Sequence, residues 1–509
     1  MMLRNILSNW MGLIVTGVIS FVLTPILIHG LGDFYYGMWV LVMSVLDYYG
    51  LLDLGIRTTL HRYVGRLKGR NDQEALDETV GTTLAITCGV GLLVVVLTVP
   101  MIFLLPKFFV VHGAARTLLQ RLVLLLGLSL AVLFPARVLG AYLCGLQRFD
   151  LYNFGVISTA IARAVSIIAV LRLGFGIVAV GIVTLAIAVL TLLLNWRLLR
   201  FADTTVSLDP RRTNWQRIRE LASFSFYAFL NTMGDYLRFY TDSAVIGRML
   251  SIALVTPFSV AGRLMSYFKE VVLGLCGPQM PRMSELDGQG KHSELRQLFL
   301  QGTKVTSAFS LIIAGLLVVN GENLLRLWLG KEYVQIYPLL IVLTLGYVAA
   351  LSQYPSRNLL YAKGRHRPFG WWTLAEGAAN LLLSIYWARR YGLMGVAVGT
   401  TLPMLVVGLL IQPWYALRLI RMSLREYARE ALLRPLIACA VFFAICWVAL
   451  DWQAPVNTAR FLVGLVWQGA VLGLLFYSIV LTRPERQIAL QRSRHLSGMV
   501  MRFSRTELR

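Results

Sequence analysis

Charged side chains lie within stretches of this sequence that are otherwise apolar. After the Lys and Arg residues of polar connecting segments are set aside, seven cations remain, which are Arg121, Arg137, Arg163, Arg238, Arg263, Lys269 and Lys304. A cation at the centre of a lipid-facing helix costs about 2.5–3.5 kcal/mol even on insertion-based scales. Arg121 and Lys304 can extend to an interface, whereas the others are expected to face a water-filled interior or buried partners.

These cations indicate an anionic substrate. Arg137 follows the helix-breaking Pro135, and Arg263 has no acidic residue three or four positions away. Because the planar guanidinium group binds phosphate in a bidentate manner, a surplus of buried Arg favours a phosphate-bearing ligand. The candidate substrate-binding residues are Arg57, Arg137, Arg163, Arg238, Arg263 and Lys269.

Carboxylates accompany the cations. Asp235, Arg238 and Asp242 are spaced i, i+3 and i+7, which places them on one face of a helix and predicts one Arg shared by two carboxylates. An intramembrane carboxylate is a natural carrier of a proton or cation, although the same spacing also suits structural ion pairs that hold helices together. The candidate ion-coupling residues are Asp235, Asp242, Glu270, Asp47 and Asp53.

No pattern typical of an enzyme is present. The five Cys lie in apolar runs without a C-x-x-C spacing, and the six His are scattered along the chain. The sequence contains no G-x-x-x-x-G-K-[ST] motif that would bind nucleotide phosphates. We therefore expect no catalytic residue, no metal site and no cofactor.

The apolar stretches that hold these charges predict an all-α integral membrane protein. Hydrophobic residues make up 57% of the 509 residues and charged residues 14%, which is more apolar than a soluble domain. Stretches of about 20 apolar residues can each cross a bilayer. About fourteen spans are predicted at 9–29, 36–60, 79–105, 117–144, 152–172, 175–199, 220–246, 251–277, 298–320, 335–361, 369–388, 393–417, 434–450 and 460–481.

An internal repeat groups the spans. Gly174–Arg200 aligns without a gap with Gly392–Arg418, giving ten identities in 27 positions, including Val-Ala-Val-Gly and a Trp…Leu-Arg ending. The two copies are 218 positions apart, which leaves room for about six spans. Because an even number of spans returns the chain to the same side of the membrane, the copies are expected to be parallel repeats, as in several transporters. The predicted parts are a six-helix bundle at 1–200, a cytoplasmic linker at 201–219, a second six-helix bundle at 220–418, two additional helices at 434–481 and a basic cytoplasmic tail at 482–509.

The formal net charge of +23 is explained by membrane topology and gives no reason to expect a nucleic acid partner. Of the 48 Lys and Arg residues, 32 fall in segments on the side of the termini and nine on the opposite side. Since cytoplasmic segments carry the excess of positive charge, both termini are predicted to be cytoplasmic. The excess also favours contact with anionic membrane lipids.

Several short segments carry a resemblance to a known family. They are Leu31–Gly37, Leu51–Arg57 followed by Arg62-Tyr63, Gly145–Phe149, Pro278–Pro281 and Lys363–Arg365. Together, over residues 1 to about 420, they resemble the polysaccharide flippases of the multidrug/oligosaccharidyl-lipid/polysaccharide exporter superfamily. The resemblance implies two six-helix bundles in a V around a central cavity, followed by two C-terminal helices.

The resemblance also implies the function. Such a protein would move polyprenyl-pyrophosphate-linked oligosaccharide units, as in O-antigen or exopolysaccharide synthesis, from the cytoplasmic to the periplasmic face of the bacterial inner membrane. It would work by alternating access driven by an ion gradient, as a monomer and without a cofactor. The implied partners are the lipid-linked oligosaccharide, membrane lipids and, as a candidate, a polysaccharide polymerase.

Other functions remain open at this point. A lipid II flippase of peptidoglycan synthesis has a similar fold and substrate. A drug/cation antiporter of the same fold would favour an acidic or aromatic cavity. A major-facilitator transporter is disfavoured because Gly55–Asp72 does not fit its G-x-x-x-D-R-x-G-R-R pattern, and a glycan polymerase would need a long outward loop.

The topology can be tested with single cysteines placed at Thr213 and Ser423, in predicted cytoplasmic segments (57–78, 197–219 and 418–433). In intact spheroplasts we expect these thiols to resist an impermeant reagent until the membrane is permeabilised. A cysteine at Ala114, on the predicted outer side, serves as the control and should react at once. Rapid labelling at Thr213 or Ser423 would reverse the orientation.

Overall fold

The computed structural model describes residues 2–53, 56–213, 233–238, 240–276, 279–365, 367–448, 457–482 and 485–487, and the regular secondary structure of these residues is helical. The first helices are α1 (Met2–Leu31), α2 (Asp33–Leu46), a 3-10 helix (Asp47–Asp53), α3 (Ile56–Gly69), α4 (Gln73–Phe108), α5 (Gly113–Gly145), α6 (Phe149–Arg172) and α7 (Ile177–Ala202). They are followed by α10 (Thr241–Met249), α11 (Val255–Cys276), α12 (Gln279–Gly288), α13 (His292–Trp328), a 3-10 helix (Lys331–Ile336), α14 (Tyr337–Ser352), α15 (Tyr354–Ala362) and α16 (Arg367–Val406). The last are the π-helical turn η3 (Val407–Ile411), α17 (Gln412–Leu419), α18 (Leu424–Tyr427), a π-helical turn (Ala428–Leu432), α19 (Leu433–Val448), α20 (Thr458–Leu475) and a π-helical turn (Phe476–Val480).

The chain forms two compact units. The first contains residues 1–263 and 367–403, and the second contains residues 264–366 and 404–509. Of the three boundaries along the chain, one falls within α11, one directly before α16 and one within α16. The division into sequential bundles at 1–200 and 220–418, with a linker at 201–219 and further parts at 434–481 and 482–509, stays a prediction.

Ten helical stretches in the described part of the chain are long and apolar enough to cross a membrane. The stretch Arg367–Leu419 contains two of the predicted spans, and it bends at Gly392, where φ is 58°. The predicted span 36–60 is instead divided among α2, a 3-10 helix and α3. Most of the predicted span 220–246 lies outside the described residues. The structure thus confirms an all-helical, multi-pass membrane protein, while the number fourteen stays a prediction.

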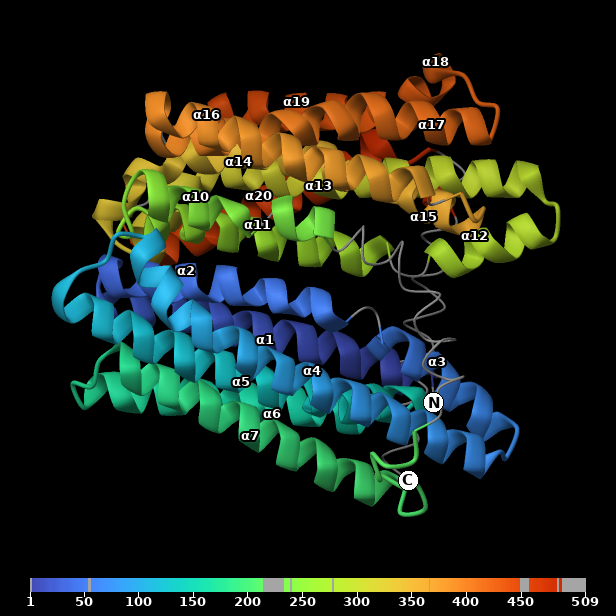
Figure 1. Ribbon diagram of the computed structural model, residues 1–509. Coiled ribbons are helices and arrows are strands. Elements are labelled where there is room, and N and C mark those ends of the chain that lie inside the picture. The colour runs from blue at the N-terminus through green and yellow to red at the C-terminus, as the bar shows by residue number, and fades with distance from the viewer. Residues whose placement is uncertain are drawn as a thin grey trace, which may run out of the picture. The chain divides into compact units, whose positions relative to one another are not determined.

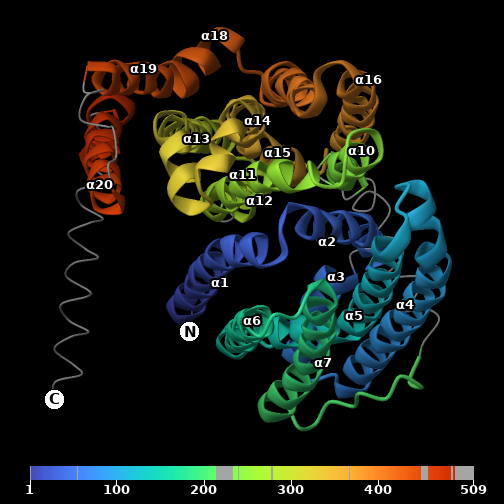
Figure 2. The same ribbon diagram turned by 90° about the vertical axis from the view of Figure 1, so that its left-hand side faces the viewer.

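Four long helices form the body of the first unit. Helix α5 packs between α4 and α7, and α6 packs against α1 and α7 (Figures 1 and 2). At one end of these helices, Leu60, Val64 and Tyr142 are buried in an apolar cluster that joins α3 to α5. A Cβ atom at Gly145 would approach the Cβ of Val64 to 2.6 Å, so the lack of a side chain there allows α3 and α5 to approach closely.

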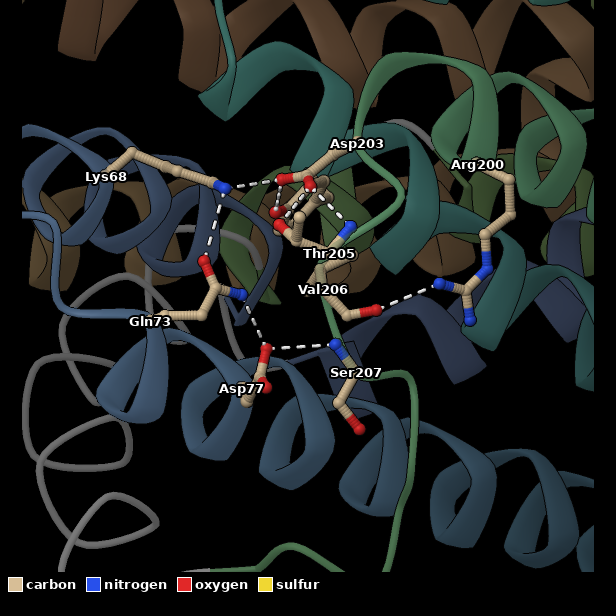
Figure 3. Close-up of polar contacts among 9 residues, drawn as sticks. Lys68, Gln73, Asp77, Arg200, Asp203, Thr205, Val206 and Ser207 are labelled. Atoms are coloured by element: carbon tan, nitrogen blue, oxygen red, sulfur yellow. Dashed lines mark hydrogen bonds and ion pairs between the residues drawn. The ribbon is translucent and has the colours of Figure 1, made fainter.

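The segment after α7 is fixed to this unit by a polar network (Figure 3). The Asp203 carboxylate pairs with the Lys68 ammonium group at 2.7 Å and accepts a hydrogen bond from the Tyr142 hydroxyl at 2.7 Å. Asp77 on α4 accepts a hydrogen bond from the Ser207 backbone N–H at 2.9 Å. The beginning of the predicted linker is therefore attached to α3, α4 and α5, whereas its residues 214–219 lie outside the described part.

In the second unit, the C-terminal helices pack on α13. Phe442 and Leu472 are buried in one apolar cluster with Ala308. Polar contacts also join these helices, since Asn320 Nδ2 donates to Gln468 Oε1 at 2.5 Å. Lys304, which the sequence suggested could extend to an interface, is instead buried, with its Nζ 2.5 Å from Glu485 Oε1.

The Asp203 network predicts a pH-dependent contribution to stability. Burial alone would raise the pKa of Asp203, but hydrogen bonds from Lys68, Thr205 and Tyr142 outweigh burial and hold it below its usual value. The ionised carboxylate therefore stabilises the fold above its unfolded-state pKa of about 4, and this contribution is lost as the pH falls below that value. We expect Asp203→Asn to lower the apparent Tm in detergent by roughly 2–6 °C at pH 7, corresponding to about 1–3 kcal/mol.

The difference in Tm between Asp203→Asn and the parent protein should narrow as the pH is lowered from 7 to 3. Asp209→Asn, which alters an exposed carboxylate of the same segment, is the matched control and should change the Tm little. A difference that stays constant over this pH range would show that Asp203 contributes through packing and not through its charge.

Candidate functional site

The first unit contains two adjoining hollows, here called the Arg-lined cavity. The larger has a volume of about 370 Å³ and the smaller about 280 Å³. They adjoin because both are lined by Leu133, Val156, Thr159 and Thr191. Residues of α1, α2, α3, α5, α6, α7 and the first half of α11 line them. A hollow of this size is typical of a ligand-binding site.

Hydroxyl groups line much of this cavity. Thr16, Ser20 and Thr24 recur every four residues on α1, so they share one face of the helix. The Thr16 and Thr24 hydroxyls each donate to a carbonyl of their own helix, at 2.7 and 2.8 Å. Such bonds allow a polar side chain to sit within an apolar helix without an unpaired donor. The sequence analysis did not identify this face, although its four-residue spacing is visible in the sequence.

Three of the predicted substrate-binding cations lie at the cavity. Arg163 on α6 and Arg263 on α11 line the larger hollow, and Arg137 on α5 lines the smaller one. The Arg163 Nε atom is buried and has no hydrogen-bond partner within the described part of the chain. Because a buried donor without a partner is costly and two like charges repel, this end of the cavity is suited to an anion.

A carboxylate offsets only part of this charge. Asp47, in the 3-10 helix after α2, interacts electrostatically with Arg137 and Arg263. The positive charge of Arg263 also interacts unfavourably with that of Arg163. Among the described residues just named, the cations thus outnumber the carboxylate by three to one, which leaves a local excess of positive charge.

The other predicted substrate-binding residues lie elsewhere. The Arg238 guanidinium pairs with Glu376 of α16 at 3.1 Å, and both side chains are largely buried. The expectation that Arg238 would be shared by Asp235 and Asp242 missed Glu376, because Glu376 is 138 positions away and becomes a neighbour only in the fold. The residues that line the two hollows do not include Lys269 or Glu270, which follow Arg263 on α11. The side chain of Arg57 lies outside the described part of the structure.

A second polar site surrounds Asp242, which is 3% exposed. Its carboxylate accepts hydrogen bonds from the Thr400 hydroxyl at 2.8 Å and the Ser384 hydroxyl at 3.4 Å. The Asn380 side-chain oxygen lies 2.8 Å from the Ser384 hydroxyl and 3.3 Å from the Thr400 hydroxyl, and the Val396 carbonyl lies 3.0 Å from Thr400 Oγ1. Because each hydroxyl has a single proton, these oxygen atoms are alternative acceptors to the Asp242 carboxylate. We call these five groups the oxygen cluster.

The bend in α16 builds the oxygen cluster. Gly392 adopts a left-handed φ of 58°, and the chain after it returns along α16, so that Ser384 Oγ lies 3.4 Å from the Val396 carbonyl oxygen. At Gly399 a Cβ atom would lie 2.7 Å from the Ser384 backbone nitrogen, so a glycine is needed there as well. The spacing of charges in the sequence indicated Asp242 but not Asn380, Ser384 or Thr400, whose convergence depends on this bend.

The oxygen cluster can hold a proton or a monovalent cation. The groups that form hydrogen bonds with the Asp242 carboxylate are two hydroxyls and one side-chain amide, and all three are neutral. A buried carboxylate in such surroundings is stabilised when it is protonated or when a cation binds beside it. Groups of three or more His, Cys, Asp or Glu residues that could hold a metal ion were not found among the described residues.

The chain matches a known protein family over more than half of its length. Residues 35–338, more than half of the chain, match the family described as "Polysaccharide biosynthesis protein". A protein of Shigella flexneri described as "Putative O-antigen transporter" is 18% identical over 421 residues, which cover 81% of this chain and 97% of that protein.

Two solved structures share the fold. The inward closed conformation of the lipid II flippase MurJ superposes with a TM-score of 0.69 at 14% identity, covering 93% of this chain and 98% of that one. The inward-facing conformation of a multidrug resistance MATE family transporter of the MOP superfamily gives a TM-score of 0.68 at 17% identity, covering 80% of this chain and 96% of that one. At these identities the likeness concerns the fold alone.

Proposed function

We propose, because the chain belongs to the polysaccharide biosynthesis protein family, that it is a flippase for polyprenyl-pyrophosphate-linked oligosaccharides. In this proposal the substrate passes from the cytoplasmic to the periplasmic face of a bacterial inner membrane, for the synthesis of a surface polysaccharide. The chain acts as a transporter without catalysis or a cofactor. It works as a monomer with cytoplasmic termini, and a polysaccharide polymerase uses its product.

The observation that carries the proposal is the presence of Arg163 and Arg263 in one hollow. A pyrophosphate group has several acceptor oxygens, and two guanidinium groups can each bind it through paired hydrogen bonds. It would also supply the acceptor that the buried Arg163 Nε atom needs. Arg137 and Asp47 then adjust the net charge of the same cavity.

The rest of the cavity suits a glycan. Threonine hydroxyls of α6 and α7 line both hollows, and threonine and serine hydroxyls of α1 line the larger one, beside apolar side chains. Sugars carry many hydroxyl groups, so a wall that can exchange hydrogen bonds with water and with sugar lowers the cost of moving them through a bilayer. The lipid tail of the substrate would remain in the surrounding membrane.

Transport against a gradient needs an energy source, and we assign it to the oxygen cluster. Of the five candidate ion-coupling residues, Asp242 has the best-defined surroundings, because its carboxylate lies among neutral oxygen atoms of α16. Binding or release of a proton or cation there changes a buried charge, which is large enough to favour one helix arrangement over another. Asp47, Asp53, Asp235 and Glu270 are secondary candidates.

Two alternatives use the same fold. A lipid II flippase also carries a pyrophosphate-linked glycan, and the likeness to the MurJ structure keeps this alternative open. A drug/cation antiporter is the second alternative, since a MATE transporter shares the fold, but the excess of positive charge in the Arg-lined cavity opposes a cationic substrate.

The Arg-lined cavity predicts a charge requirement for export. Arg163→Ala and Arg263→Ala should each reduce glycan export roughly tenfold or more, since a hydrogen bond to a charged group contributes about 1.5–3 kcal/mol. Replacement by Lys should rescue only in part, because an ammonium group cannot form the bidentate contact. Export is measured as surface polysaccharide, alongside the abundance of the protein in the membrane.

Arg172→Ala is the matched control, because Arg172 is exposed at the end of the same helix as Arg163. It should export glycan normally. Normal export by both Arg163→Ala and Arg263→Ala would remove the basis of the proposed substrate site.

The oxygen cluster predicts that Asp242 couples glycan translocation to a proton or sodium gradient. In proteoliposomes with an imposed proton or sodium gradient, Asp242→Asn should make glycan translocation independent of the gradient while the protein remains folded. Asp150→Asn alters a carboxylate that pairs with Arg148 at the start of α6, and it should retain full gradient dependence. If Asp242→Asn lowers protein abundance but residual transport still follows the gradient, the cluster is structural and Glu270 becomes the next candidate.

A further inference from the structure

An open hollow of about 730 Å³ lies at the end of a membrane span in the second unit. Its wall is formed by η3, α17 and the start of α18. Leu409, Leu410 and Trp414 line it, and all three side chains are exposed. We call it the C-terminal hollow. It is separate from the Arg-lined cavity and from the oxygen cluster, both of which belong to the first unit.

The local backbone builds this hollow. The π-helical turn Val407–Ile411 widens the helix and lets Leu410 project outward, where it is 64% exposed. On the opposite side of this turn, a Cβ atom at Gly408 would come within 2.9 Å of the Ala349 backbone, so the turn is held tightly against α14. The apolar side chains that line the hollow are therefore displayed on a fixed surface.

The end of α17 adds a second constraint. Arg421 has a left-handed φ of 51°, a conformation that costs a residue other than glycine about 1–2 kcal/mol. This turn carries the chain to Met422 and Leu424, which also line the hollow. It also places the Arg421 side chain among the residues that line it.

Two guanidinium groups accompany the apolar wall. The Arg418 guanidinium lies 4.2 Å from the centre of the Trp414 ring, and both Arg418 and Arg421 are exposed. The nearby carboxylate of Glu426 is engaged by Arg296 at 2.6 Å. Positive charge therefore accumulates where the apolar surface of the span Arg367–Leu419 ends.

The internal repeat shows that this arrangement is particular to the second copy. Trp196 and Arg200 of the first copy align with Trp414 and Arg418. In the first copy, Arg200 donates a hydrogen bond to the Val206 carbonyl at 2.9 Å and holds the following segment against its own helix (Figure 3). In the second copy the equivalent guanidinium stacks on the tryptophan and remains exposed beside the hollow.

We propose that the C-terminal hollow binds an anionic phospholipid. One acyl chain lies against Leu409, Leu410 and Trp414, while the phosphate group contacts Arg418 and Arg421. A phospholipid fits because it joins an apolar chain to a phosphate at the depth where a membrane span ends, and basic pockets at such positions bind anionic headgroups. This inference rests on the helical membrane spans and not on the proposed substrate.

The test uses the purified full chain in detergent and compares retention of phosphatidylglycerol and phosphatidylcholine by native mass spectrometry. We expect the parent protein to retain phosphatidylglycerol, and the double variant Arg418→Ala/Arg421→Ala to bind it at least fivefold more weakly. The matched control is Arg389→Ala/Arg390→Ala. This exposed pair lies on α16, and its Arg390 guanidinium stacks on the Tyr386 ring at 5.5 Å. The control should bind as the parent does.

The location of the bound phospholipid is tested by the quenching of tryptophan fluorescence with phosphatidylglycerol that carries brominated acyl chains. Trp414→Phe should remove part of the quenchable signal, and the Arg418/Arg421 double variant should reduce quenching by the anionic lipid.

Three outcomes would overturn the proposal. Equal retention of the two phospholipids would indicate a hollow without headgroup recognition. Copurification of a lipid-linked pyrophosphate that is lost in the double variant would assign the hollow to the transported substrate. If the parent protein elutes as a dimer from a size-exclusion column and the double variant elutes as a monomer, this surface is an interface between copies of the chain.

Discussion

Two guanidinium groups share a hollow within a membrane-spanning unit, and the free energy of keeping them charged constrains much else in this protein. Arg163 and Arg263 cannot be neutralised by Asp47 alone, so they require water, a ligand or both. The helices around them must then present polar faces toward the cavity and apolar faces toward lipid. Helix α1 satisfies this requirement with hydroxyl groups that bond to its own carbonyls, because unpaired donors would add to the cost already incurred by the charges.

The sequence predicted the chemistry of the site better than its geometry. The cations at the cavity were identified because charge within apolar stretches is visible in the sequence, and the match to the polysaccharide biosynthesis protein family confirms the resemblance drawn from segments such as Leu51–Arg57. The repeat and the apolar runs likewise predicted an all-helical membrane protein, which the structure confirms. Contacts such as Arg238 to Glu376 could not be predicted, because spacing along one helix says nothing about a neighbour that the fold supplies.

Interruptions of the helices are a second feature that could not be predicted from the sequence. Hydropathy treats residues 36–60 as one span, but the chain there changes from α2 to a 3-10 helix and then to α3. The bend at Gly392 and the π-helical turn at Val407–Ile411 are equally invisible to an average over twenty residues. Yet these irregular positions create the oxygen cluster and the C-terminal hollow. Two of the three sites to which we assign a role therefore lie where helices depart from regular geometry, an arrangement that membrane transporters often use for ion and substrate sites.

The contacts of Asn380 connect the proposed ion site to a buried ion pair. Its side-chain nitrogen donates to the Arg238 backbone carbonyl at 2.9 Å, while its oxygen lies 2.8 Å from the Ser384 hydroxyl, whose single proton can be donated to Asn380 or to Asp242. Arg238 in turn pairs through its guanidinium with Glu376, one turn before Asn380 on α16. In the proposed ion-driven cycle, a change of charge at Asp242 would change which oxygen atoms accept the protons of the Ser384 and Thr400 hydroxyls, and Asn380 would exchange its hydrogen bonds accordingly. Such a rearrangement would move residues 233–238 against α16 while the charges stay buried, which is a physical condition for any ion-driven change in helix packing.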